Sequence, residues 1–210
     1  MKITEIIRKK TYYEVYAGDA VYEIDGELLR QYHIQEGESL DEDTLEELHK
    51  KSRFRRAYRR ACYLLDDRDY SYCMMYQKLM HTYQDKELCI SVMEQLVQCG
   101  AINDKRYARK LAEYLVERKH YGIYRIRQEL LRKGIDKDLT ETCVRNLEEQ
   151  SMEYLPDVLA KKYGSQLTDP ADFKTRDKVI AGMSRLGYDY SSIKKAVEDY
   201  FQNTEQDEKS

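Results

Sequence analysis

The chain of 210 residues is long enough for one large hydrophobic core or two smaller ones. It is 41% apolar and 36% charged with only two prolines, a composition that favours exposed helix surface over one compact globule. The formal net charge is −3 but unevenly spread: residues 53–145 carry 20 basic against 13 acidic side chains, residues 1–52 carry 7 against 13, and residues 146–210 carry 9 against 13. The middle of the chain is therefore its basic part.

Cysteine usage and the N-terminal sequence bear on the compartment of the protein. Five cysteines form no C-x-x-C pair and have no histidine at zinc-ligand spacing, which is typical of small core residues in a reducing cytosol. The first ten residues, MKITEIIRKK, lack the apolar run of an export signal, and no run of about 18 apolar residues occurs. We predict a cytoplasmic protein with no membrane association, no metal and no cofactor.

Residues 2–25 alternate between apolar and polar side chains and are rich in Tyr, Val and Ile. Gly18 and Asp19 separate two of these segments, and glycine supplies the positive φ that tight hairpins need, so we predict a small sheet. Ser39 and Glu42 then have the spacing of a capping box at a helix start. We therefore assign residues 1–52 to a strand-rich N-terminal extension with a linking helix.

The sequence from residue 53 onward is helical in pattern and repeats itself. Residues 77–96 align without a gap with residues 128–147, and residues 181–200 follow the same pattern of helix, turn and helix. We predict a mainly α chain of three tandem three-helix repeats, 53–102, 103–150 and 151–202, forming an elongated curved array. Chance similarity of amphipathic helices is the alternative. Residues 203–210 are predicted to be a disordered tail.

Motifs for known catalytic chemistry are missing from the sequence. There is no metalloprotease helix, phosphate-binding loop, nucleophile elbow or dinucleotide fingerprint, and the four histidines fall in different predicted elements. We predict no catalytic residues and no enzymatic activity.

The segment RFRRAYRRACYLL carries a cluster of arginines that its own helix does not neutralise. Arg55 and Arg59 are four residues apart, as are Arg56 and Arg60, and none has an acidic residue three or four positions away. Like charges at that spacing cost a helix roughly 0.2–0.5 kcal/mol per pair. The pattern favours an anionic partner for this face. The alternatives are a solvated face or acidic residues that the fold brings in.

A second basic segment, GIYRIRQELLRKGI, divides its arginines between two faces of a helix. Arg125 and Arg132 lie opposite the apolar stripe, with Glu129 between them. Arg127 lies at the edge of the stripe, where we expect it to pair within the fold. Arg125 and Arg132 are the better candidates for contact with a partner.

The second predicted repeat also carries a dense motif in a fixed order. It consists of Gly100, Asp104, Arg106, Tyr107 and Ala108, then Arg118, Gly122, Arg125, Ile126, Glu129, Leu130, Lys133, Gly134 and Ile135. These positions resemble the hallmark of the RecX family of RecA recombinase regulators. YLLDDRDYS, which includes Arg68, is similar to the family's first-repeat motif, although Tyr72 and Cys73 depart from it, as does Asn103 in the second repeat.

The resemblance implies both a fold and a function. The fold is three tandem three-helix repeats. The function is binding along the groove of the RecA filament on single-stranded DNA, with inhibition of its ATP hydrolysis, strand exchange and growth, in homologous recombination, DNA repair and the SOS response. Some family members also bind DNA directly, so an autonomous, weak DNA-binding protein is one alternative and a protein-interaction scaffold is another. We expect a monomer.

The candidate site residues fall into two groups. We assign contacts with the filament or with DNA to Arg56, Arg60, Arg109, Lys110, Arg125, Arg132 and Lys133. The remaining motif residues are candidates for structural roles at helix junctions: Arg68, Asp104, Arg106, Tyr107, Arg118, Gly122 and Gly134.

Overall fold

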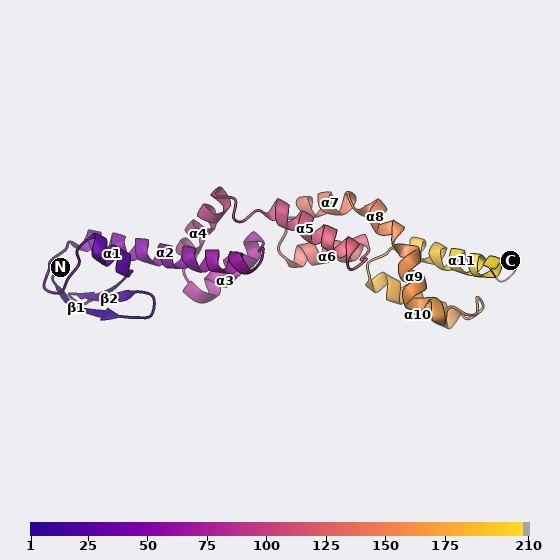
Figure 1. Cartoon of the computed structure of the whole chain (residues 1–210), viewed down its shortest axis with the longest axis horizontal. Coiled ribbons are helices and arrows are strands. Elements are labelled where there is room, and N and C mark those ends of the chain that lie inside the picture. Colours follow the sequence, from indigo (N-terminus) through magenta and orange to yellow (C-terminus); the bar gives the residue numbers. More distant parts are fainter. Residues whose placement is uncertain (208–210) are drawn as a thin grey trace. The chain divides into compact units, whose positions relative to one another are not determined.

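The computed structural model describes residues 1–207 as a mainly helical chain with a three-stranded antiparallel sheet at its N-terminus (Figure 1). This confirms the predicted mainly α fold with a strand-rich N-terminal subdomain. The chain divides into two compact units, Met1–Ile102 and Asn103–Ser210. Within the described part of the chain, none of the helices combines the length and the apolar character needed to cross a membrane.

The N-terminal sheet follows the alternation seen in the sequence. Its strands are β1 (Ile3–Arg8), β2 (Tyr13–Ala17) and β3 (Ala20–Ile24), in the order β1-β2-β3. Gly18, with φ of +60°, turns β2 into β3 as predicted. One face of the sheet packs on α1 (Gly26–Gln31) and on the start of α2 (Glu42–Asp67). The fully buried residues of this core include Ile3, Val15, Ala17, Ile24, Leu28 and Leu45.

Both outer strands of the sheet have hydrogen-bond partners outside the sheet. The backbone N–H of Glu23 in β3 donates to Nδ1 of His49 on α2, at 2.8 Å. The N–H of Ile3 in β1 donates to the carbonyl oxygen of Glu38, also at 2.8 Å. These contacts occupy edges that would otherwise be available for pairing with another chain.

Helix α2 begins one residue after Asp41 and runs without interruption from the N-terminal extension into the first repeat. The Asp41 carboxylate accepts from the Thr44 N–H at 2.7 Å, so Asp41 is the N-cap. The predicted capping box of Ser39 and Glu42 is wrong, because the backbone of Ser39 forms a β-bridge with Lys2 instead.

The first repeat combines the second half of α2 with α3 (Tyr72–Tyr83) and α4 (Lys86–Gln98). The three helices pack on one another around a core that includes Ala57, Ala61, Met75, Leu79, Val92 and Leu96. Ser71 caps α3 and Asp85 caps α4 through their side chains. The predicted boundary between residues 52 and 53 therefore falls inside one continuous helix.

The second unit contains two further groups of helices. The first group is α5 (Asp104–Glu117), α6 (Ile123–Arg132) and α7 (Lys137–Arg145). The second is α8 (Glu148–Glu153), α9 (Leu155–Tyr163), the 3-10 turn η1 (Gly164–Gln166), α10 (Phe173–Arg185) and α11 (Tyr190–Asp207). Helix α11 includes residues 203–207, which the sequence analysis assigned to the tail, whereas residues 208–210 lie outside the described part.

Helix α6 begins against the loop that joins α10 to α11. Gly122 is its N-cap and has no side chain to accept a hydrogen bond. The Gly122 N–H donates to the Leu186 carbonyl at 2.9 Å, and the Tyr124 N–H donates to the Gly187 carbonyl at 3.1 Å. Carbonyl groups from the last group of helices thus satisfy N–H groups that a helix start leaves free. A Cβ on Gly122 would lie 2.2 Å from the Gly187 carbonyl, so only glycine permits this approach.

Replacing Gly122 with alanine should destabilise the second unit. The backbones must separate to admit the methyl group, and overpacking of this kind costs about 1–3 kcal/mol. Chemical denaturation followed by circular dichroism would measure the loss. Gln128→Ala, at an exposed position on the same helix, is the matched control and should stay within about 0.5 kcal/mol of the parent chain. Equal stability of the two variants would contradict this account of the junction.

The partial burial of His49 predicts a pH dependence of stability. Burial of the ring lowers the pKa of His49 below its ordinary value. The unfolded chain then binds a proton more readily than the folded chain, so this group stabilises the fold above about pH 6.5, and that contribution is lost as the pH falls toward the lowered folded pKa. Denaturation between pH 7.5 and 5 should give a steeper loss for the parent chain than for His49→Gln, whose amide oxygen can still accept a hydrogen bond. Parallel curves would rule out the effect.

Candidate interaction surface

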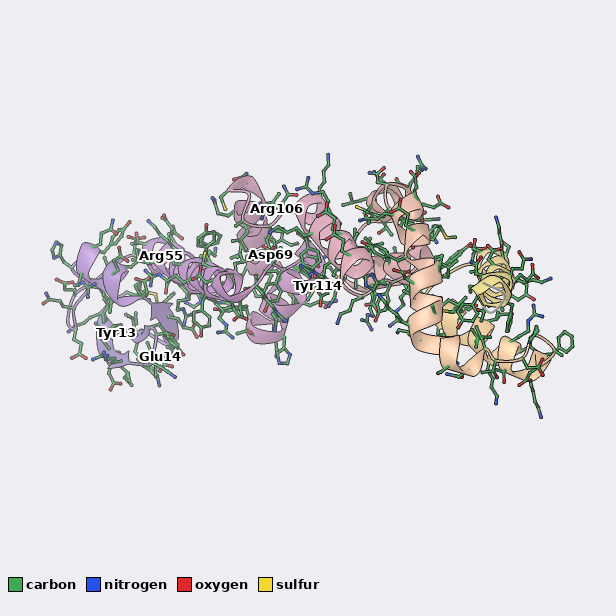
Figure 2. The ribbon with its side chains drawn as sticks, turned by 45° about the vertical axis from the view of Figure 1, so that its right-hand side comes forward. Tyr13, Glu14, Arg55, Asp69, Arg106 and Tyr114 are labelled. Atoms are coloured by element: carbon green, nitrogen blue, oxygen red, sulfur yellow. The ribbon has the colours of Figure 1, made fainter. Side chains whose placement is uncertain are left out.

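Three of the four arginines clustered on α2 are neutralised by acidic residues of the N-terminal subdomain. Arg55, labelled on α2 in Figure 2, pairs with Glu27 and lies 3.6 Å from a carboxylate oxygen of Asp25. Arg59 reaches Glu27 at 3.1 Å. The expectation that this whole face awaits an anionic partner is therefore wrong, because the fold supplies the acids that the helix itself lacks.

Arg56 is held most firmly of the four. Its guanidinium pairs with Glu23 of β3 and lies 4.1 Å from the centre of the Tyr12 ring. Only 12% of its side chain is exposed. Arg56 is therefore a structural residue rather than a contact residue, since its charge stabilises the packing of α2 on the sheet.

Arg60 differs from its three neighbours. It is exposed and lies 5.6 Å from the centre of the exposed Tyr63 ring. Among residues 1–207 the structure shows no ion pair for this guanidinium. Arg60 is thus the member of the cluster that remains available to a partner.

A buried carboxylate organises the basic face of α6. Glu129 is 8% exposed; its Oε1 forms an ion pair with a terminal nitrogen of Arg125 at 2.9 Å, and its other oxygen pairs with Arg132. The two arginines keep 39% and 69% of their side-chain surface exposed. One fixed acid therefore holds two outward-facing guanidinium groups with a net charge of +1. We name Arg125, Glu129 and Arg132 the α6 triad.

Arg127 has the structural role expected from its place on the helical wheel. Its Nε and one terminal nitrogen donate to the two carboxylate oxygens of Glu141 on α7, at 2.7 and 3.0 Å. These hydrogen bonds raise the pKa of Arg127 and lower the pKa of Glu141. The pair links α6 to α7, so Arg127 is not a candidate for partner contact.

The remaining predicted contact residues lie on α5 and just after α6. Arg109 is exposed, and its Nε is 3.7 Å from the carboxylate of Glu113 one turn along the helix. Lys110 is exposed as well, while Lys133 is half-buried as the residue that ends α6. The structure thus brings Arg109, Lys110 and the α6 triad into one compact unit.

Several motif residues lie at helix ends. Asn103 caps α5, since its side-chain oxygen accepts from the Arg106 N–H at 2.8 Å, which explains how a departure from the family pattern is accommodated. Arg118 ends α5 and Arg68 ends α2. Gly134, with φ of +75°, turns the chain out of α6 in a conformation that favours glycine. The half-buried Tyr107 packs on the core of the second repeat, and Asp104 lies in the first turn of α5.

One feature of the surface could not be found from the sequence. The acids that neutralise the α2 arginines lie 28 to 33 residues earlier in the chain, where only the local excess of acidic residues hints at them. Over the described residues there is no group of three His, Cys, Asp or Glu side chains placed to hold a metal. What the structure offers is a set of exposed basic groups on a helical scaffold.

Comparison with known proteins points to one family. A family model described as RecX, second three-helix domain, matches residues 103–143. Regulatory protein RecX of Serratia proteamaculans (strain 568) is 34% identical over 116 residues, which are 53% of this chain and 67% of that protein. Its counterpart from Clostridioides difficile (strain 630) is 24% identical over 93% of this chain and 92% of its own length.

Two solved structures share the fold. A crystal structure of regulatory protein RecX has a TM-score of 0.68 at 21% identity and covers 92% of this chain and 98% of that one. The crystal structure of RecX from Lactobacillus salivarius has a TM-score of 0.64 at 18% identity, over 71% of this chain and 97% of that one. Motif, relatives and fold agree, and the chain belongs to the RecX family of regulatory proteins.

Proposed function

We propose that this protein binds the RecA filament on single-stranded DNA and inhibits its ATP hydrolysis, strand exchange and growth. The observation that carries the proposal is the α6 triad, in which a buried acid fixes two exposed arginines inside the motif typical of the family. Preorganised guanidinium groups lose less conformational freedom on binding than free ones and suit carboxylates and phosphates. The activity assigned here is regulatory and non-enzymatic, and the place of action is the cytoplasm.

The contact residues in this proposal are Arg60, Arg109, Lys110, Arg125, Arg132 and Lys133. They come from α2, α5, α6 and the residue after α6. We propose that they meet acidic groups of adjacent recombinase subunits or the phosphates of the bound strand, with the protein acting as a monomer.

Direct binding of single-stranded DNA is a second candidate. Exposed tyrosines lie near cations at several places, among them Tyr63 beside Arg60, and Tyr114 beside Lys119 at 5.8 Å. Stacking of bases on such rings, with cations beside them, is how many proteins hold single strands. Affinity for a free oligonucleotide that falls steeply with salt would favour this candidate.

Removing the exposed arginines should weaken inhibition. We expect the protein to lower the DNA-dependent ATPase rate of RecA with dose, and the triple variant Arg60→Ala, Arg125→Ala, Arg132→Ala to need at least about tenfold more protein for half-inhibition, which corresponds to about 1.4 kcal/mol. The control Lys161→Ala, Lys162→Ala, Lys194→Ala removes the same charge from exposed positions of the third repeat. Absence of inhibition by the folded parent chain would refute the proposal.

The α6 triad permits a test that separates positioning from net charge. Glu129→Gln raises the positive charge of the face but releases both arginines, so we expect half-inhibition to need about fivefold more protein and stability to fall by about 1 kcal/mol. Glu117→Gln, at an exposed position of α5, changes the net charge equally and should leave inhibition unchanged. Stronger inhibition by both variants would mean that charge alone governs binding.

A further inference from the structure

A groove of about 550 Å³ lies between α5 and α7 in the second repeat. Its floor is apolar and is formed by Ala112 of α5 with Leu139, Cys143 and Leu147 from α7 and the residues beside it. The small side chain of Ala112 leaves room between the two helices. Leu139 and Leu147 are only half-buried, so apolar surface remains within reach of a ligand.

The rim of this groove is basic on the α5 side. Lys105 and Arg109 are both exposed there, and Arg106 lines the same side. Glu113 is the acidic residue of the lining, and it lies 3.7 Å from Arg109. The opposite rim on the α7 side carries neutral polar side chains, including Thr142. The lining as a whole therefore has a positive charge above an apolar floor.

Grooves between the first and third helices of the other two repeats differ in charge. In the first repeat, the groove between α2 and α4 has three basic against two acidic lining residues, and two of these, Arg53 and Asp85, form an ion pair at 2.8 Å. In the third, the groove between α9 and α11 has Asp157 and Asp199 against Lys195. Of these three grooves, the one in the second repeat has the largest excess of basic over acidic lining residues.

We propose that the α5–α7 groove binds an acidic amphipathic helix of a partner protein. Apolar side chains of that helix enter the groove over Cys143, and its carboxylates meet Lys105 and Arg109. This mode of recognition places an apolar stripe in a groove and charged side chains at the rim. The inference rests on the proposed function in one respect: only that function identifies the partner as a recombinase subunit.

The apolar floor argues for a peptide rather than a nucleic acid. Phosphate groups could pair with Lys105 and Arg109, but a nucleic acid backbone has no apolar side chain to cover Leu139 and Cys143. Burial raises the pKa of the Cys143 thiol, in agreement with the poorly hydrated character of the floor. A ligand that satisfies both parts of the groove has carboxylates and aliphatic side chains together.

Two synthetic peptides test the inference; both have about 14 residues and the same amino-acid composition. In the first, leucines recur at helical spacing i, i+3, i+4 and i+7 among glutamates; in the second the same residues are scrambled. Fluorescence anisotropy of each labelled peptide with the full chain should show at least tenfold tighter binding of the amphipathic peptide. Amide chemical shifts should change mainly on α5 and α7. Equal affinity for the two peptides, or shifts spread over other helices, would overturn the proposal.

Variants of the groove complete the test. Thr142→Trp fills the groove from an exposed lining position, and Lys105→Glu with Arg109→Glu reverses the rim charge; each should weaken peptide binding at least tenfold. Gln128→Trp on α6, and Lys161→Glu with Lys162→Glu on α9, are the matched controls and should bind normally. If the parent chain binds an oligo-dT probe but not the peptide, and the groove variants lose the probe, the ligand is a nucleic acid and the inference fails.

The ATPase assay separates this inference from the proposed function. If the parent chain and Thr142→Trp inhibit the filament equally, the regulatory function stands and the groove is not its partner site. If the parent chain does not inhibit, the regulatory function fails, and the designed peptides still decide whether the groove binds acidic helices. Loss of inhibition and of peptide binding in Thr142→Trp, with both retained in Gln128→Trp, supports the inference.

Discussion

The contact between the start of α6 and the loop after α10 is the constraint on which the second unit depends. Two backbone carbonyls cap a helix that has no capping side chain of its own, and this works only because Gly122 and Gly187 let the backbones meet. The Tyr188 hydroxyl adds a hydrogen bond to the His120 carbonyl at 2.9 Å, and burial raises the pKa of Tyr188 to about 12. The α6 triad is therefore carried by a helix whose start is fixed by a neighbouring group of helices.

The charge pattern of the protein divides into structural and available parts. Three arginines of α2 form ion pairs with acidic residues of the N-terminal subdomain: Arg55, Arg56 and Arg59. Arg127 forms an ion pair with Glu141 of α7. Arg60 and the two arginines of the α6 triad keep exposed guanidinium surface. A count of basic residues overstates the binding surface, because the same residue type holds the helices together and faces solvent.

Features determined by residues close together in the sequence could be predicted, whereas contacts between distant segments could not. The hairpin at Gly18, the 3.6-residue periodicity and the separate role of Arg127 follow from neighbours within a few residues, and the structure agrees with them. The choice of Asp41 over Ser39 as N-cap depends on Lys2, just before strand β1, whose backbone forms a β-bridge with Ser39 from 37 residues away along the chain. Tertiary contacts of this kind produce no periodic pattern in the sequence. The α5–α7 groove could not be predicted for the same reason.

The uninterrupted course of α2 has a geometric consequence for the first unit. The N-terminal subdomain packs on one end of this helix and the first repeat packs on the other, so the helix sets the angle between them. An α-helix turns by about 100° and rises by about 1.5 Å per residue. One residue inserted near position 52 would rotate the sheet by a quarter-turn or more around the helix axis, whereas about seven inserted residues would nearly restore its orientation. The number of residues in α2 therefore determines how the N-terminal sheet is oriented relative to the first repeat.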